Sequence, residues 1–154
     1  MLRRATNKDI PVITGLIFEI LNEYGLKPDS ATTDSDLLEI EKSYFINGGT
    51  FDVLEDGQGK IIATVGLFNM GNNTCELRKM YLLKSERGKG RGKLLLDHAI
   101  STAKGLGYKK MILETASVLK EAISLYERYG FKKYSPEHLS GRCDQAYFLD
   151  LNNN

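Results

Sequence analysis

The sequence predicts a single domain of the mixed α/β class, in which helices cover both faces of a mixed β-sheet. A chain of 154 residues with 42% hydrophobic and 27% charged residues has the size and composition of one globular domain. The apolar period also changes along the chain, from helical to extended and then to an alternation of the two. The expected order of elements is β-α-α-β-β-β-α-β-α-β-β, in one domain over 1–151 followed by a polar tail at 152–154.

A short strand and an amphipathic helix open the chain. The strand is predicted over Leu2–Ala5. Thr6 can then cap a helix, because Asp9 three residues later completes a variant of the capping box. Apolar residues at spacings of three and four indicate that one face of this helix is buried, and Gly25 ends it. These residues are Ile13, Leu16, Ile17, Ile20, Leu21 and Tyr24. The segment 26–33 is predicted to be a loop.

The middle of the chain changes from a helical to an extended pattern. A weaker helical pattern covers Leu37–Phe45. Strands are then predicted over Phe51–Glu55 and Lys60–Asn69, because Asp56–Gly59 between them has the composition of a hairpin turn. A second turn leads to a third strand over Thr74–Leu83. We expect this half of the sheet to be antiparallel.

The last third alternates between helices and strands. Helices are predicted over Gly92–Leu106 and Lys120–Tyr129, each ended by a glycine. Strands are predicted over Lys110–Thr115, Phe131–Tyr134 and Gln145–Leu151. The first of these helices joins two strands, and a right-handed crossover makes those two strands parallel.

Charge and composition argue against several classes of protein. The chain holds 21 Lys+Arg and 20 Asp+Glu, so no net positive field attracts nucleic acid or an anionic membrane. No apolar run reaches the ~18 residues of a membrane-spanning helix, and the residues after Met1 lack the apolar core of a signal peptide. Cys75 and Cys143, with two histidines, make neither a disulfide framework nor a metal site. We therefore expect a cytoplasmic protein with reduced thiols.

The positive charge is concentrated in the ten residues Lys84–Lys93, which carry five basic residues and one acidic residue. This segment joins a predicted strand to a predicted helix. Unpaired N–H groups at a helix N-terminus favour phosphate, and glycines allow backbone amides to approach an anion closely. The glycines are Gly88, Gly90 and Gly92, and the cations around them are Arg87, Lys89, Arg91 and Lys93. The segment predicts a polyphosphate site. A solvated basic loop is the alternative.

Two common phosphate motifs are absent from this segment. No Ser or Thr follows Gly92-Lys93, as the nucleoside triphosphate motif GxxxxGK[ST] requires. The spacing G-x-G-x-G also differs from the dinucleotide fingerprint G-x-G-x-x-G, and the expected acidic residue about 20 positions later is missing. A nucleoside triphosphate and a nicotinamide cofactor are therefore disfavoured.

Three segments together resemble a known family. Arg87–Gly92 matches the R/Q-x-x-G-x-G/A signature of the GNAT superfamily of acetyl-CoA-dependent N-acetyltransferases. Glu76–Leu82 is similar to the family's central strand, and Ala122–Phe131 to its A-x-x-x-Y-x-x-x-G-F motif. The resemblance implies a partly splayed sheet and acetyl-CoA as the acetyl donor. It also implies that the loop from Arg87 to Lys93 holds the diphosphate of coenzyme A.

The resemblance also implies roles for strand and helix residues. Backbone groups of Met80, Tyr81 and Leu82 would pair with the pantetheine arm and polarise the thioester carbonyl. Tyr126 occupies the position of the family's general acid, and a phenol with an ordinary pKa of about 10 keeps its proton at neutral pH. A core tyrosine is the alternative. Leu119 stands where many members carry an asparagine that binds pantetheine.

Glu76 is the candidate base for the incoming amine. If strand alternation holds, it shares a face with Arg78, Met80 and Leu82, the face that would approach the thioester. A bulge in this strand would overturn the assignment. An ion pair with Arg78 or Lys79 is the alternative role.

The function expected is transfer of an acetyl group from acetyl-CoA to a primary amine, by direct attack in a ternary complex. A non-catalytic acyl-CoA sensor is the first alternative, and a nucleic-acid binder that uses the basic loop is the second. The acceptor could be a small molecule or a peptide. The final strand could pair across a homodimer.

Overall fold

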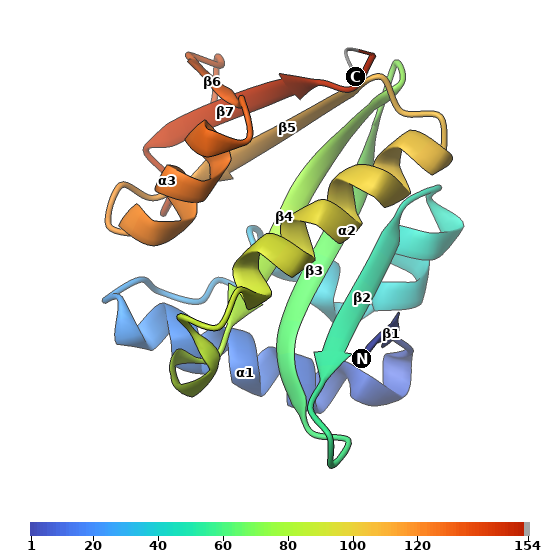
Figure 1. The fold of residues 1–154 in the computed structure, drawn as a ribbon, viewed down its shortest axis with the longest axis vertical. Helices are drawn as coiled ribbons and strands as arrows, with labels where there is room; N and C mark the ends of the chain where they lie inside the picture. The colour runs from blue at the N-terminus through green and yellow to red at the C-terminus, as the bar shows by residue number, and fades with distance from the viewer. Residues whose placement is uncertain (153–154) are drawn as a thin grey trace.

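The computed structural model describes residues 1–152, and within them the chain forms one seven-stranded sheet in the order β1-β2-β3-β4-β5-β7-β6 (Figure 1). Only β4 and β5 pair in parallel, and the other neighbours are antiparallel. The strands are β1 (Leu2–Arg4), β2 (Thr50–Glu55), β3 (Ile61–Gly71), β4 (Thr74–Leu82), β5 (Lys110–Thr115), β6 (Lys132–Tyr134) and β7 (Gln145–Asp150). Each agrees with a predicted strand. Asn153 and Asn154 of the predicted tail lie outside the described residues.

Helices cover both faces of the sheet, as predicted. They are α1 (Ile10–Glu23), α2 (Arg91–Gly105) and α3 (Lys120–Arg128). The apolar stripe of α1 packs in one core cluster with the residues of β2. The buried residues of α2 and α3 pack in a second cluster with β3, β4 and β5. In Figure 1, α1 and α2 accordingly lie on opposite sides of the strands between them.

The predicted capping box at the start of the first helix is present. The backbone N–H of Thr6 donates to the Asp9 carboxylate at 2.9 Å, and the Thr6 hydroxyl also contacts this carboxylate. Arg3 binds the same carboxylate with two nitrogens at 2.9 Å. The hydrogen bond from Arg3 lowers the pKa of Asp9, so the carboxylate is held as an anion at a helix start.

The weaker helical pattern over Leu37–Phe45 is helical in the structure, but it does not form one α-helix. The chain instead forms a 3₁₀ turn at Ser35–Leu38 and a π-helical segment at Glu41–Ile46. The wider turn brings the buried Tyr44 ring between Phe51 and Phe68, with ring centroids 5.0 and 5.7 Å away. Its hydroxyl donates to Asp36. Packing of one buried aromatic residue therefore overrides the helical period.

The sheet opens between β4 and β5, as expected. The two strands pair only where Thr74–Glu76 lie beside Lys110–Ile112. Parallel strands normally stay about 4.8 Å apart over their whole length because a hydrogen-bond ladder joins them. Here the ladder ends after three residue pairs, although β4 continues to Leu82. The partly splayed sheet leaves a gap beside the second half of β4.

A bulge divides β4 into two halves with opposite alternation. The register against β3 shifts between Arg78 and Tyr81, and Lys79 has a φ of +54°. The Thr64 hydroxyl supports the bulge by donating to the Lys79 carbonyl at 2.6 Å. Met80 then packs with the α2 cluster and Tyr81 with the α1 cluster.

The bulge corrects the expected face of Glu76. Its partner Arg78 stacks on Phe68, a ring that packs with the α1 cluster. Met80 and Leu82 pack on the opposite side, with α2 and α3. Alternation does not continue through the extra residue of a bulged strand, so the prediction that Glu76 shares a face with Met80 and Leu82 is wrong.

Candidate active site

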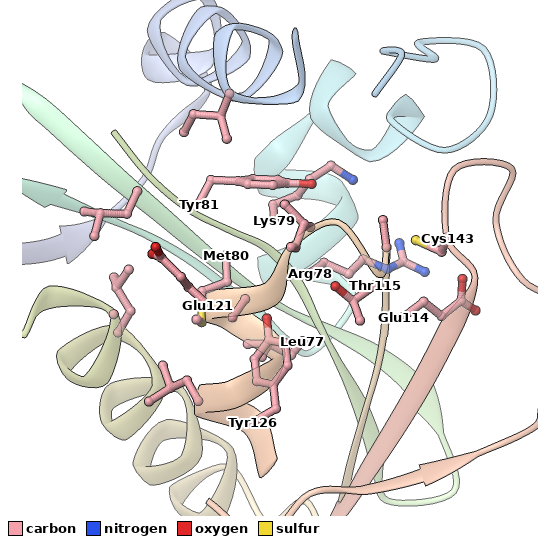
Figure 2. Close-up of a pocket in the computed structure, with 18 of the residues that line it drawn as sticks. Leu77, Arg78, Lys79, Met80, Tyr81, Glu114, Thr115, Glu121, Tyr126 and Cys143 are labelled. Atoms are coloured by element: carbon pink, nitrogen blue, oxygen red, sulfur yellow. The ribbon is translucent and has the colours of Figure 1, made fainter. Parts of the chain in front are cut away.

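A cavity of about 950 Å³ lies where β4 and β5 separate (Figure 2). Ligand-binding cavities typically span about 300–1,000 Å³. Its wall includes the second half of β4, the end of β5, the start of α2 and the inner face of α3. The loop 135–144 and the end of α1 complete it. All three segments that resemble the GNAT motifs therefore contribute to one cavity.

The glycine loop forms an array of free backbone donors at one end of this cavity. Gly88 and Gly90 have φ values of +76° and +79°, a backbone region that is costly for residues with a Cβ. Gly90 is the N-cap of α2. Within residues 1–152, the N–H groups from Gly88 to Lys93 donate to no protein acceptor. The positive end of a fifteen-residue helix and these amides make a binding site for an anion.

The side chain of Arg87 is engaged by the protein itself. Its Nη1 and Nη2 atoms bind the two carboxylate oxygens of Glu23 at 2.5 and 3.0 Å, and Nη1 also donates to the Tyr24 hydroxyl at 3.0 Å. Its Nε donates to the Leu82 carbonyl at 3.1 Å. The hydrogen bond from Arg87 lowers the pKa of Glu23. Arg87 thus ties the glycine loop to the end of α1 and to β4.

The other cations of the loop lie at the surface beside single carboxylates. Lys89 and Arg91 both approach Glu86, at 3.7 and 3.3 Å. Lys93 pairs with Asp97 at 3.0 Å, and its side chain is 67% exposed. Exposed pairs of this kind contribute little and exchange readily with solvent. These three cations are available to an anionic ligand that reaches the loop.

Tyr126 points from α3 into the cavity (Figure 2). The residue is buried as a whole, and within residues 1–152 its hydroxyl makes no hydrogen bond to the protein, since its oxygen lies at the cavity wall and not in closed packing. Burial raises the pKa of Tyr126 well above its ordinary value, with smaller contributions from Tyr81 and Cys143. The phenol therefore stays protonated at neutral pH, and its O–H is free to donate toward the cavity.

Glu76 lines the cavity, but its carboxylate forms an ion pair with the neighbouring Arg78. It accepts a hydrogen bond from Nε of Arg78, and the side chains of Glu76 and Arg78 are 11% and 27% exposed. The ion pair foreseen as the alternative role of Glu76 is therefore present.

Sequence reasoning missed Glu114, which also lines the cavity. It lies near the carboxyl end of β5, where it accepts a hydrogen bond from the Ser140 backbone N–H at 2.9 Å. No cation pairs with its carboxylate among the described residues. The sequence contained a signal for Glu114. In sheets with parallel strands, ligands bind beyond the carboxyl ends of those strands, and β5 is the parallel neighbour of β4.

The remaining predicted residues lie along the same wall. Met80, Tyr81 and Leu82 line the cavity beside the gap. Burial raises the pKa of Tyr81, and the charge of Arg142 opposes this rise. The Tyr81 ring lies across the cavity in Figure 2. Leu119 is the N-cap residue of α3, and it too lines the cavity without offering an amide side chain.

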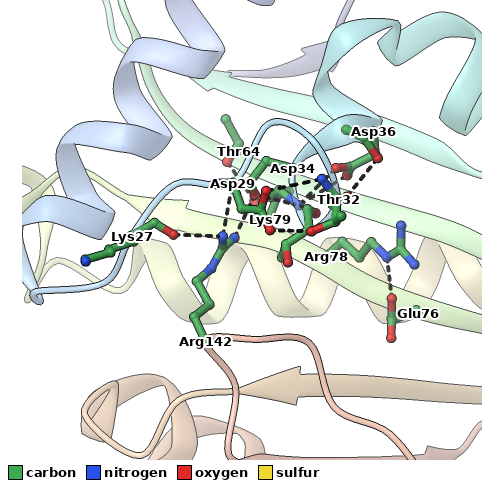
Figure 3. Close-up of polar contacts among 12 residues, drawn as sticks. Lys27, Asp29, Thr32, Asp34, Asp36, Thr64, Glu76, Arg78, Lys79 and Arg142 are labelled. Carbon is green, nitrogen blue, oxygen red and sulfur yellow. Dashed lines mark hydrogen bonds and ion pairs between the residues drawn. The ribbon is translucent and has the colours of Figure 1, made fainter.

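A buried cluster of charges closes the wall beside the β4 bulge (Figure 3). The Lys79 ammonium lies 3.3 Å from the Asp34 carboxylate and 3.1 Å from that of Asp36. It also donates to the Thr33 carbonyl at 3.2 Å. Arg142 binds the other side of Asp34. The cluster fixes the loop after α1 against β4.

Comparison with known proteins agrees with this geometry. Residues 16–131 match the model of the acetyltransferase (GNAT) family. The chain is 39% identical to the uncharacterized N-acetyltransferase YjgM of Escherichia coli (strain K12) over 137 residues, covering 86% of this chain and 81% of that protein. The family model spans well over half of the chain, and so the protein belongs to the GNAT family of acetyltransferases.

Solved structures show the same fold. An acetyltransferase of the GNAT family from Staphylococcus aureus Mu50 superposes with a TM-score of 0.91 at 26% identity, covering 98% of each chain. A phosphinothricin acetyltransferase from Sinorhizobium meliloti, solved in complex with acetyl-CoA, has a TM-score of 0.73 at 24% identity, covering 96% of this chain and 85% of that one. Within residues 1–152, every helix is too short or too polar to cross a bilayer.

Proposed function

We propose that this protein, acting through one domain over 1–151, transfers an acetyl group from acetyl-CoA to the amine of a small molecule or peptide by direct attack. One observation carries the proposal: the array of free amides from Gly88 to Lys93 opens into the gap beside β4, and the unpartnered Tyr126 hydroxyl faces that gap. A diphosphate fits the amides and the three loop cations. An extended chain with amide groups fits the unpaired edge of β4.

Acetyl-CoA supplies an activated acetyl group on a thioester when it is bound. Tyr126 is suited to give its proton to the departing sulfur, because its raised pKa keeps the phenol protonated until sulfur leaves. The phenolate then recovers a proton from solvent. Backbone N–H groups of β4 beside the gap can polarise the thioester carbonyl.

A carboxylate must accept the proton that the acceptor's ammonium loses. Glu76 and Glu114 both line the cavity. Partial burial raises the pKa of the Cys143 thiol, and the negative charges of Glu114 and Glu76 add to this rise, so both carboxylates act on the same part of the cavity. Glu114 lacks a cationic partner among residues 1–152, whereas Glu76 is bound by Arg78. We therefore assign the base to Glu114, acting directly or through water, with Glu76 as the second candidate.

The cosubstrate is tested by calorimetry with acetyl-CoA and by release of free thiol with a panel of amines. Tyr126→Phe is expected to lower the rate of thiol release by about 100-fold or more. Tyr129→Phe is the matched control, since this tyrosine is the C-cap residue of α3, three positions after Tyr126, and its hydroxyl donates to the surface residue Asp97. Equal rates for the two variants would remove Tyr126 as the acid.

The base is tested by comparing Glu114→Gln with Glu76→Gln. Removal of the base is expected to lower the rate by about 100-fold at pH 7 and to abolish the acidic limb of the pH–rate profile. Retention of this limb in Glu114→Gln and its loss in Glu76→Gln would return the role to Glu76. Binding of acetyl-CoA without thiol release from any amine would instead favour the sensor.

A further inference from the structure

The guanidinium of Arg78 is fixed on one edge and open on the other (Figure 3). Nε is bound by Glu76, and the plane stacks on Phe68 with 3.8 Å between Cζ and the ring centroid. Nη2 lies 4.0 Å from the Met70 sulfur, which is a weak acceptor. Within residues 1–152, Nη1 has no acceptor at all. Arg78 lines the cavity, and its fixed guanidinium therefore offers the coplanar N–H donors of Nη1 and Nη2 to a ligand there.

An oxygen anion with two acceptors in one plane matches this open edge. Arginine binds carboxylates with two parallel hydrogen bonds, and a guanidinium already held by stacking loses little freedom in doing so. Because the side chain is only 27% exposed, water satisfies it less well than it would a surface arginine. The carboxylate of Glu76 on the guanidinium, and that of Glu114 in the same cavity, disfavour a dianion such as a phosphate monoester.

The same end of the cavity has a place for a cation. Glu114 lines it without a cationic partner in the described chain. The other charges at this end are paired within the protein, Lys79 and Arg142 with Asp34 and Asp36, and Arg78 with Glu76. A molecule with one ammonium and one carboxylate fits both features.

We propose that the acceptor is a free amino acid, whose carboxylate binds the open edge of Arg78 while its ammonium faces Glu114. This inference rests on the proposed acetyl transfer and narrows its acceptor. Arg78 is then a specificity-determining residue that contacts the acceptor without taking part in the proton transfers.

The test compares glycine and the standard L-α-amino acids that have a primary amine with their α-carboxamides, which keep the side chain and the amine but remove the negative charge. For the preferred side chain, kcat/KM is expected to be about 100-fold or more higher for the acid than for the amide. Arg78→Gln should remove most of this preference, chiefly through KM. Arg78→Lys should restore part of the preference for the acid, because lysine returns the positive charge but not the two parallel N–H donors of the guanidinium.

A matched control separates recognition from folding. Arg4 also stacks on a ring, Phe45 at 3.7 Å, but it lies outside the cavity, so Arg4→Gln should keep the ratio of acid to amide. A merely structural role of Arg78 would lower the rates with acid and amide equally. Such an equal loss would overturn the inference, as would a panel in which no amino acid exceeds its amide.

Calorimetry with acetyl-CoA on the same wild-type sample distinguishes failure of the amino-acid inference from failure of the proposed acetyl transfer. Acetyl-CoA binding with thiol release from amides or simple amines, but no preference for acids, overturns the amino-acid acceptor alone. Absence of acetyl-CoA binding overturns the proposed transfer and this inference with it.

Discussion

Arg142 binds both carboxylate oxygens of Asp34, with Nη1 to Oδ2 at 2.8 Å and Nη2 to Oδ1 at 2.7 Å. The two residues are 108 positions apart in the sequence. Arg142 belongs to the loop between β6 and β7, and Asp34 to the loop after α1, so the pair joins the two halves of the molecule beside the cavity (Figure 3). The Asp34 side chain is fully buried, and that of Arg142 is 11% exposed.

Replacement of Arg142 by methionine is expected to lower the free energy of unfolding by about 3 kcal/mol, because removal of one partner leaves a buried charge incompletely paired. Lys79 remains near Asp34 and limits the loss. Urea unfolding measures the change. Lys93→Met, which removes a pair at the surface, is the control and should leave the unfolding free energy unchanged. An equal effect of the two replacements would contradict a structural role for the buried pair.

Acid should destabilise the protein partly through Asp34. Burial alone would raise the pKa of Asp34, but hydrogen bonds from Arg142 and the Asp29 backbone N–H hold it below its ordinary value. A carboxyl with a depressed folded-state pKa stabilises the fold above its unfolded-state pKa of about 3.9, and this contribution is lost as the pH falls further. The free energy of unfolding should therefore fall between pH 5 and pH 3 less steeply in Arg142→Met than in the wild type. Identical slopes would show that this pair does not set the dependence.

Gly90→Ala should weaken both the fold and the binding of acetyl-CoA. A Cβ at a φ of +79° costs about 1 kcal/mol, and relaxation of this strain would move the amides at the start of α2. We expect a loss of about 1 kcal/mol in stability and an increase of about tenfold in the Kd for acetyl-CoA. Gly105→Ala lies in the same helix with open space around it, and it should be neutral or stabilising. Unchanged affinity in Gly90→Ala would argue against the amide array as the diphosphate site.

Direct attack predicts that no cysteine carries the acetyl group. Burial raises the pKa of Cys75 to about 12 and raises that of Cys143 as well, so both thiols are protonated at neutral pH. Cys143 lines the cavity, and Cys143→Ala should keep the rate of thiol release within about threefold of the wild type. Mass spectrometry of protein mixed with acetyl-CoA alone should find no added acetyl group. A stable adduct on Cys143 would indicate a two-step transfer instead.

Much of the fold could be predicted because its signals are local. Turn residues and a change in apolar period placed every strand, and the capping box at Thr6 placed the first helix. The glycine loop could be recognised because the glycines that allow a tight backbone at the start of a helix lie close together in the sequence. The segment around Tyr44 escaped this reasoning because a buried aromatic contact decides its geometry.

The rest of the site depends on contacts between distant residues. Nothing beside Arg87 in the sequence indicates that Glu23 and Tyr24 occupy its guanidinium. The left-handed backbone of Lys79 is held by Thr64 and by Asp36, and without that bulge Glu76 would have faced the other way. Glu114 joins the cavity only once β5 lies beside β4.

The early end of the ladder between β4 and β5 has a consequence for inhibitor design. Strand edges normally recognise any extended chain that alternates amide donors and acceptors, whatever its side groups. Here such an edge lies within a cavity instead of on the surface, and the pairing that would cover it stops at Glu76. A short peptidomimetic backbone that carries an acidic head for the amides of α2 should therefore compete for this protein, and its selectivity would have to come from the far end, where Arg78 and Glu114 lie.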